Sequence, residues 1–420
     1  MIFKFGRRLF QFAIKQFFSR IVIKGEAPLE KGAVLITPNH FNMLIDPLLI
    51  CSVFRRDLWF LAKSTLFQHP LADWFLRQAH LVPVYRRQDN PADSGKNLET
   101  FRFAADALSR KRAVVIFPEG VSSGERRLAP LKTGAARIGL QAEEAHDFTL
   151  GVRMQPVGIN YSELRQFQST VTIYLGKAIE LNRYKENYRN DTIATVKAVT
   201  EELEAGLKMV TAEVLSAQHE QLVERIAKLY QCHGSISDDY ERLNTIAKNV
   251  EKLAPQFPER SIDFDSRIRS YLEMQESLGD FRSMQGFAGG GFLLRVLTAP
   301  FILWGVVFHY LPYRLTALFT RRISRHPASE ASLKLVWGLA DFLSWYLIVL
   351  TCLLYSGRGV FASIVSLIVC FFCAKLSLKY FQALRLQILC FLWPGRRNPV
   401  KVLDLMRSQL ISELESLRVE

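Results

Sequence analysis

A histidine and an aspartate follow the first strongly apolar run of the chain, at residues 33–37. His40 and Asp46 lie six positions apart. Histidine is the side chain best suited to accept a proton near neutral pH, and a carboxylate on its second ring nitrogen would fix the tautomer. On a regular helix this spacing would separate the two side chains by about 120°. We therefore expect a loop or broken turn to join them, with Pro47 disfavouring a helical Asp46. The pair predicts a general base and its orienting acid; the alternative is a helix-entry loop with polar caps.

A carboxylate follows a second buried-strand pattern, at residues 113–117. Glu119 and Gly120 come just after this run. The carboxyl ends of parallel strands meet at one edge of a sheet, where ligands collect. Because His40 also follows such a run, we expect His40 and Glu119 to share one cleft.

Basic side chains follow the same predicted strands and could hold a phosphate. Arginine binds phosphate through two hydrogen bonds, and a helix N-terminus adds backbone N–H donors. Such a helix is predicted to open at Thr133 and Gly134. The basic residues are Arg86, Arg87, Arg126, Arg127 and Lys132. As a set they predict a phosphate site, whereas each one alone is typical of a solvated surface charge.

A competing pattern overlaps the second strand end. Residues 120–124 read Gly-Val-Ser-Ser-Gly, which matches the nucleophile elbow of serine hydrolases and would make Ser122 the nucleophile. An elbow needs a helix packed on the sheet directly after the serine, and residues 125–130 do not open one. A serine lipid hydrolase therefore stays an alternative, as does a membrane binding module without catalytic activity.

Apolar runs with strand and helix patterns alternate over residues 21–185, which predicts an α/β domain with a largely parallel or mixed sheet flanked by helices. The predicted strands are residues 21–24, 33–37, 58–62, 81–85, 113–117, 154–160 and 171–174. The predicted helices include residues 47–54, 69–78, 98–109 and 133–144.

The other regions predict membrane attachment. Residues 1–20 read as a basic amphipathic helix that anchors at a membrane surface, or alternatively packs on the core. Residues 186–285 predict a helical subdomain, 286–398 a membrane-associated region with a helical hairpin at 335–374, and 399–420 a C-terminal helix or tail.

The first hairpin arm, residues 335–355, would span about 31 Å as a helix, enough for a bilayer core. It carries Asp341, which we expect to face protein or an interface. Residues 296–311 contain Pro300 and are predicted to be interfacial or half-buried rather than a full span.

Charge agrees with a membrane surface. The formal net charge is +14, yet no motif for nucleic-acid binding is visible, so we exclude that class. A basic chain with apolar segments favours an anionic bilayer and phosphorylated substrates. Basic residues flank both ends of the predicted hairpin, which places both ends, and the α/β domain, on the cytoplasmic face.

Four sequence blocks over residues 21–174 together resemble the glycerolipid acyltransferases, a family that includes glycerol-3-phosphate and 1-acylglycerol-3-phosphate acyltransferases. The blocks are Asn39-His40 with Asp46-Pro47, Val82–Arg86, Phe117–Gly120 and Gln155–Gly158. Five residues separate His40 from Asp46, where the commoner motif of the family has four. This spacing resembles the branch that acylates glycerol 3-phosphate or dihydroxyacetone phosphate. The third block carries Ser122 where the family commonly has an arginine.

The resemblance implies acyl transfer from acyl-CoA or acyl carrier protein to a hydroxyl of glycerol 3-phosphate, dihydroxyacetone phosphate or a lysophospholipid. It implies that His40 and Asp46 are catalytic and that the reaction needs no metal or other cofactor. The implied substrate-binding residues are Asn39, Arg86, Glu119, Gly120, Arg126 and Lys132. Within this set, Glu119 and Gly120 would position the acceptor and the basic residues would hold its phosphate.

Overall fold

The computed structural model describes residues 2–85, 97–214, 216–231, 239–278, 292–324, 326–392 and 399–416. The chain divides into two units. Unit 1 contains Met1–Leu215 and Arg325–Ser332, and unit 2 contains Ser216–Ser324 and Leu333–Glu420. A short stretch from late in the sequence therefore belongs to the N-terminal unit.

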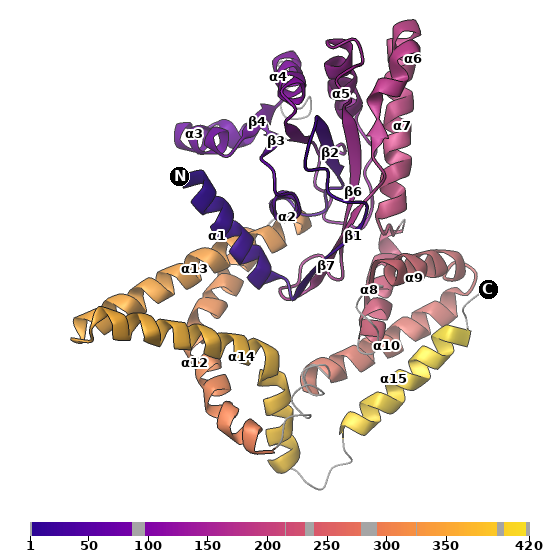
Figure 1. The fold of residues 1–420 in the computed structure, drawn as a ribbon. Coiled ribbons are helices and arrows are strands. Elements are labelled where there is room, and N and C mark those ends of the chain that lie inside the picture. Colours follow the sequence, from indigo (N-terminus) through magenta and orange to yellow (C-terminus); the bar gives the residue numbers. More distant parts are fainter. Residues whose placement is uncertain are drawn as a thin grey trace. The chain divides into compact units, whose positions relative to one another are not determined.

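Unit 1 is built on a mixed, mostly parallel sheet of eight strands in the order β1-β7-β6-β2-β5-β3-β4, with β8 paired to β6 (Figure 1). The strands are β1 (Arg20–Gly25), β2 (Val34–Pro38), β3 (Leu58–Lys63), β4 (Leu81–Val84), β5 (Ala113–Val115), β6 (Arg153–Tyr161), β7 (Thr170–Leu175) and β8 (Ile179–Glu180). Among the strand pairs of the described residues, β6–β7 and β6–β8 are antiparallel and the others are parallel. The predicted fold class and its seven strands are confirmed, and the two-residue β8 was not predicted.

The central strand β2 positions the predicted site. All of its residues are buried, and it pairs in parallel with β5 on one side and β6 on the other. Because the three strands run in one direction, their carboxyl ends lie at the same edge of the sheet. β6 pairs with β2 up to Pro38↔Val157 and then continues to Tyr161, so it extends beyond the end of β2.

Helices cover the sheet of unit 1 through apolar contacts. Leu35 of β2 packs into a core shared with helices α4, α5 and α7, and Figure 1 shows α5 and α7 alongside the sheet. Because successive side chains of a strand point to opposite faces, Val34 and Ile36 face the other side of the sheet. The helical segments are α1 (Ile2–Phe17), α2 (Ile45–Val53), η1 (Ser64–Phe67), α3 (Pro70–Gln78), α4 (Asn97–Ser109), α5 (Gly134–Glu144), η3 (Leu181–Tyr184), α6 (Lys185–Asn190) and α7 (Thr192–Val210).

The N-terminal helix packs on unit 1 over part of its surface. Ile14 and Phe17 of α1 are buried, and the Gln11 side chain donates a hydrogen bond to the Cys51 carbonyl of α2 at 3.1 Å. Phe12 is 47% exposed. The C-terminal half of α1 therefore has the packing of a core helix, and its role as a membrane anchor stays a prediction.

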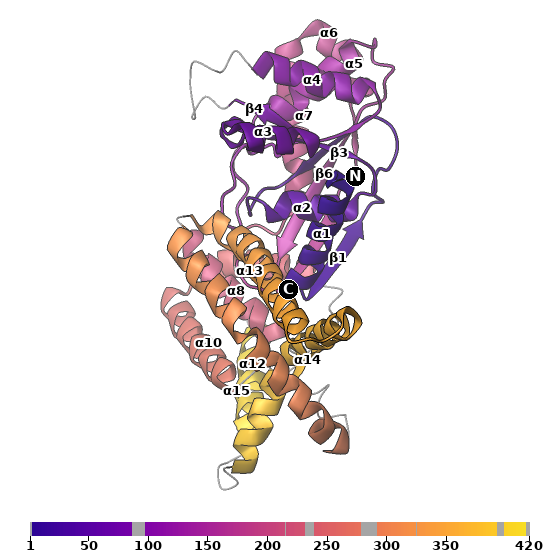
Figure 2. The same ribbon diagram turned by 90° about the vertical axis from the view of Figure 1, so that its left-hand side faces the viewer.

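Unit 2 is helical throughout its described residues. Its helices are α8 (Ala217–Gln231), α9 (Asp239–Leu253), α10 (Pro258–Leu278), α12 (Phe292–Ile323), most of α13 (Pro327–Tyr355), α14 (Val360–Leu392) and α15 (Pro399–Ser416). Helices α12 and α14 lie side by side in both ribbon views, and the Ser377 hydroxyl donates to the Ile302 carbonyl between them (Figures 1 and 2).

Among the residues that the structure describes, three helices are long and apolar enough to cross a membrane, over Val296–Ile323, Pro327–Tyr355 and Val360–Phe381. The expectation of a short, half-buried segment at residues 296–311 is therefore wrong in length, since α12 continues through Pro300 and Pro312. The predicted hairpin corresponds to α13 and α14, and α14 extends past residue 374. Asp341 of α13 accepts a hydrogen bond from the Thr316 hydroxyl of α12 at 2.8 Å, so it faces protein as expected.

Candidate active site

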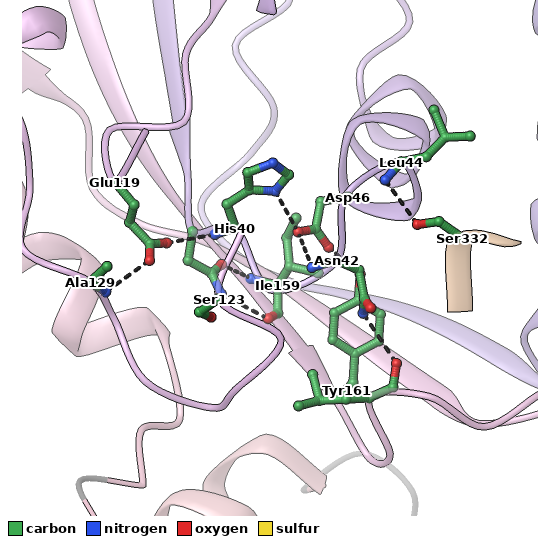
Figure 3. A network of polar contacts seen from close by, with 12 residues as sticks. His40, Asn42, Leu44, Asp46, Glu119, Ser123, Ala129, Ile159, Tyr161 and Ser332 are labelled. Atoms are coloured by element: carbon green, nitrogen blue, oxygen red, sulfur yellow. Dashed lines mark hydrogen bonds and ion pairs between the residues drawn. The ribbon is translucent and has the colours of Figure 1, made fainter. Parts of the chain in front are cut away.

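The structure brings His40 and Asp46 together just beyond the end of β2. The His40 Nδ1 atom lies 2.9 Å from Asp46 Oδ2, and Figure 3 shows the two side chains facing each other. Asp46 is helical, in the first turn of α2, so the expectation that Pro47 would keep it out of the helical region is wrong. Proline is tolerated in a first helical turn because the N–H it lacks has no partner within the helix there. The turn at the start of α2 thus closes the six-residue spacing.

Asp46 is fully buried, and two more groups fix its carboxylate. The Asn42 backbone N–H donates to Oδ2 at 2.8 Å, and the Tyr161 hydroxyl donates to Oδ1 (Figure 3). Burial raises the pKa of Tyr161 well above its ordinary value, so the hydroxyl stays protonated and donates. Three donors around a buried carboxylate fix its orientation.

Tyr161 was not among the predicted site residues. Its only signal was its place at the carboxyl end of β6, the same edge of the sheet as His40. Nothing in the sequence indicated that β6 extends beyond β2 and carries the tyrosine to Asp46.

The His40 ring keeps one nitrogen for a substrate. Its Nδ1 faces Asp46, and the ring stacks on Phe117 with centroids 4.0 Å apart. The side chain is 12% exposed, in contrast to the fully buried Asp46. With Nδ1 bonded to the carboxylate, Nε2 on the other side of the ring is the atom that could accept a proton.

Glu119 lies next to His40, but its carboxylate faces the backbone. One oxygen accepts the His40 N–H at 2.7 Å and the other accepts the Ala129 N–H at 2.8 Å (Figure 3). The residue is 1% exposed, and burial raises its pKa to about 7 although both N–H bonds favour the ionised form. The expected proximity of His40 and Glu119 is present. In this arrangement the carboxylate holds the loop that carries His40.

Asn39 is also used within the protein. Its side-chain oxygen accepts the Ile159 N–H at 2.6 Å and its side-chain nitrogen donates to the Ile159 carbonyl at 3.2 Å. The residue is fully buried. The amide therefore continues the pairing of β2 with β6 past the end of β2, where it sets the start of the loop to His40.

The predicted basic residues separate into three groups. Arg126 is buried and donates to the carbonyls of Tyr161 and Ser162, so its expected place at an acceptor phosphate is wrong as the structure stands. Arg86 lies outside the described residues. Lys132 is exposed, and a Cβ added to Gly120 would lie 2.9 Å from its Nζ atom. Arg127 of the same loop is exposed as well. Lys132 is thus a predicted cation that the structure places at the surface and beside Gly120.

Gly120 meets two demands at this position. Its φ of +68° is a left-handed conformation that side chains disfavour, and an added Cβ would require the end of the Lys132 side chain to move. The Gly120 N–H donates to the Phe117 carbonyl at 3.0 Å, which closes a tight turn after β5.

The geometry of a nucleophile elbow is not met. Residues 116–133 form turns and bends, and α5 begins only at Gly134. The segment instead runs beside the loop after β2, where the Ser123 N–H donates to the His40 carbonyl at 3.1 Å and the Gly124 N–H to the Phe41 carbonyl at 3.0 Å. Within the described ranges, no three or more His, Cys, Asp or Glu side chains cluster in a way that would hold a metal ion.

Comparisons with known proteins agree with the motifs. Residues 20–160 match the family model described as Acyltransferase, in agreement with the resemblance of the sequence blocks. The match covers the strands β1 to β6 that carry the site.

Over 141 residues the chain is 31% identical to glycerol-3-phosphate O-acyltransferase 2 of Saccharomyces cerevisiae, which covers 33% of this chain and 19% of the yeast protein. Over 123 residues it is 28% identical to a 1-acyl-sn-glycerol-3-phosphate acyltransferase of Limnanthes alba, covering 29% of this chain and 41% of that protein. Among solved structures, the acyltransferase PlsC from Thermotoga maritima aligns at 21% identity and a TM-score of 0.34, over 49% of this chain and 80% of PlsC. The aligned segment thus covers less than half of the length of each of these two curated relatives.

Proposed function

We propose that this protein is a membrane-bound O-acyltransferase that moves a fatty acyl group from a thioester to a hydroxyl of a phosphorylated glycerol. The observation that carries the proposal is the hydrogen bond between His40 and the buried Asp46 within an acyltransferase domain. The acceptor classes are glycerol 3-phosphate, dihydroxyacetone phosphate and lysophospholipids. The donor is acyl-CoA or acyl carrier protein, and the chemistry requires no metal or other cofactor.

The chemistry needs one positioned base. His40 Nε2 takes the proton of the acceptor hydroxyl while the oxygen attacks the thioester carbonyl carbon. The carbon–sulfur bond then breaks, an ester forms, and the departing thiolate takes up the proton from His40. Asp46 holds Nδ1–H and stabilises the imidazolium that exists between the two proton transfers. The enzyme therefore returns to its starting state without a covalent intermediate.

The roles of the surrounding residues follow from what each one contacts. Glu119 and Asn39 position the loop of His40 through its backbone and through β6. Lys132, beside Gly120, is exposed and is the described cation that we assign to the acceptor phosphate. A lysine holds a phosphate as a point charge. Arg86 is proposed to act with it, on the strength of its place in the second sequence block.

The bilayer is both an anchor and the destination of the product. Three helices have the length and composition to span it. Acyl thioesters are amphiphilic and acylated glycerols are lipids, so a site at the headgroup level lets both partition without crossing water. The basic residues around these helices favour placing the acyltransferase domain on the cytoplasmic face.

The identity of the product tests the proposal. The full-length protein in phospholipid vesicles is incubated with radiolabelled acyl-CoA, with and without each acceptor, and the lipids are separated. We expect label in an acylated glycerophosphate only when an acceptor is present, and no change in the Ser122→Ala variant. Release of free fatty acid without an acceptor, lost in Ser122→Ala, would instead identify a hydrolase.

A further inference from the structure

A segment from the far end of the chain contacts the loop between His40 and Asp46. The Met43 N–H donates to the Ala328 carbonyl at 3.1 Å, and the Leu44 N–H donates to the Ser332 hydroxyl at 2.9 Å. Figure 3 shows Ser332 reaching Leu44 beside the catalytic pair. The two partners of the second bond are 288 positions apart in sequence, yet both belong to unit 1.

The segment accepts two backbone N–H groups of the loop. Met43 and Leu44 are 48% and 37% exposed, so these bonds hold the loop in one conformation rather than satisfy deeply buried donors. Asp46 accepts the Asn42 N–H, but the next two residues lie before the first hydrogen-bonded turn of α2 and cannot use that carboxylate. Ala328 and Ser332 supply the two acceptors that the five-residue spacer lacks within itself.

The packing around the segment is close. Ala328, Ala331 and Ser332 are each less than 9% exposed. Gly124, from the loop after β5, lies against the same turn, since a Cβ added there would come 2.6 Å from the Ala328 nitrogen. The segment therefore touches both loops that form the candidate site.

We infer that the first turns of α13, residues 327–332, are a positioning element of the active site, with Ser332 as its principal side chain. The inference rests on the proposed function. Helix α12 ends at Ile323 and α13 begins at Pro327, so these first turns open one candidate membrane span a few residues after another ends. Seating those helices in a bilayer then restrains the loop that holds His40 and Asp46. Attachment to the membrane therefore helps to fix the geometry of the catalytic base.

Ser332→Ala tests the inference in the full-length protein in vesicles, with Ser329→Ala as the matched control. The Ser329 hydroxyl lies in the same turn but donates to the His326 carbonyl of its own segment. Hydrogen exchange of the Met43 and Leu44 amides is read by mass spectrometry. We expect exchange in Ser332→Ala to rise about two- to tenfold, the factor for one net hydrogen bond, with Ser329→Ala unchanged and Ser332→Thr close to the parent.

Steady-state kinetics provide the second reading. We expect Ser332→Ala to lower kcat about tenfold, because small misplacements of a catalytic group are costly, with the acceptor KM unchanged and the amount of folded protein equal to the parent. Exchange and kcat that match Ser329→Ala would overturn the inference, and so would a loss of activity that only follows a loss of folded protein. Because the exchange reading needs no turnover, failure of the acyl-transfer proposal would leave it interpretable.

A second variant keeps the test valid if Ser332→Ala fails to fold. Gly124→Ala adds a methyl group against Ala328 at a backbone φ of +71°. Gly151→Ala is the control, because its φ of +70° imposes the same backbone strain while no atom lies within 4 Å of the added carbon. We expect faster exchange at Met43 and Leu44 in Gly124→Ala only. Equal exchange in the two glycine variants would contradict a contact of the turn with the loop.

Discussion

The two loops that follow β2 and β5 carry the same signature in the sequence and have different tasks in the structure. Each begins after a buried strand and carries one ionisable residue near its start, His40 in one and Glu119 in the other. His40 has one ring nitrogen on Asp46 and a partly exposed ring, whereas both Glu119 oxygens accept backbone N–H groups in a buried site. A polar residue at a strand end therefore indicates a site. Whether it can act on a substrate depends on whether one of its polar atoms is left without a partner inside the protein.

The largest effect of these substitutions is expected at Asp46, the partner that distinguishes His40 from Glu119. In Asp46→Asn the amide can no longer stabilise an imidazolium and can favour the wrong tautomer of His40. We expect kcat to fall about 10³- to 10⁴-fold, measured as transfer of labelled acyl groups by the folded protein in vesicles. A fall of less than tenfold would remove Asp46 from the mechanism.

Glu119 is expected to control stability through its charge. Burial raises its pKa from 4.5 to about 7. Between these values the folded protein keeps a proton that the unfolded chain has lost, so the free energy of unfolding falls as pH rises through this window, by about 3 kcal/mol in total. Thermal unfolding of the parent from pH 4.5 to 7 should show this slope, and Glu119→Gln should reduce it by the contribution of this one carboxyl group.

The control for Glu119 is Glu125→Gln, since Glu125 is an exposed carboxylate of the same loop. It should keep the slope of the parent. If Glu119→Gln has that slope as well, the carboxylate is ionised throughout the range and the buried, loop-holding assignment has to be revised.

Tyr161 extends the catalytic side of the comparison beyond the two loops. Tyr161→Phe removes the hydroxyl that donates to Asp46 and leaves the ring in place. We expect kcat to fall about 30-fold through misplacement of the pair, with the acceptor KM unchanged. Tyr184→Phe, which removes a hydroxyl bonded to Glu202 elsewhere in unit 1, serves as the control. Equal rates in the two variants would leave Tyr161 as a packing residue.

The smallest effect is expected at Lys132, the exposed end of the β5 loop. Lys132→Gln removes one charged donor, and we expect the KM for a phosphorylated acceptor to rise about fivefold, the factor for one net hydrogen bond of about 1 kcal/mol, at unchanged kcat. Lys177→Gln changes an exposed lysine of the same unit and should leave both constants unaltered. A lower kcat at unchanged KM would assign Lys132 to the reaction instead of binding.

Local patterns predicted most of unit 1, because strand and helix periods are properties of short stretches. The seven predicted strands and the contact of His40 with Asp46 are present. The residues that the sequence did not assign, Tyr161 and Ser332, act through partners that are distant in the chain. Arg126 was misassigned for a related reason, since a buried arginine that binds carbonyls and a surface arginine that binds phosphate look alike in a sequence.

The rate of acyl transfer in His40→Ala tests the central claim most directly. Parent and variant are compared as folded, full-length proteins in vesicles, with acyl-CoA and the best acceptor, in the absence and presence of added imidazole. We predict that the variant loses about 10²- to 10⁴-fold in kcat and that imidazole restores part of it. A folded variant that transfers acyl groups at the parent rate would contradict the assignment of His40 as the base.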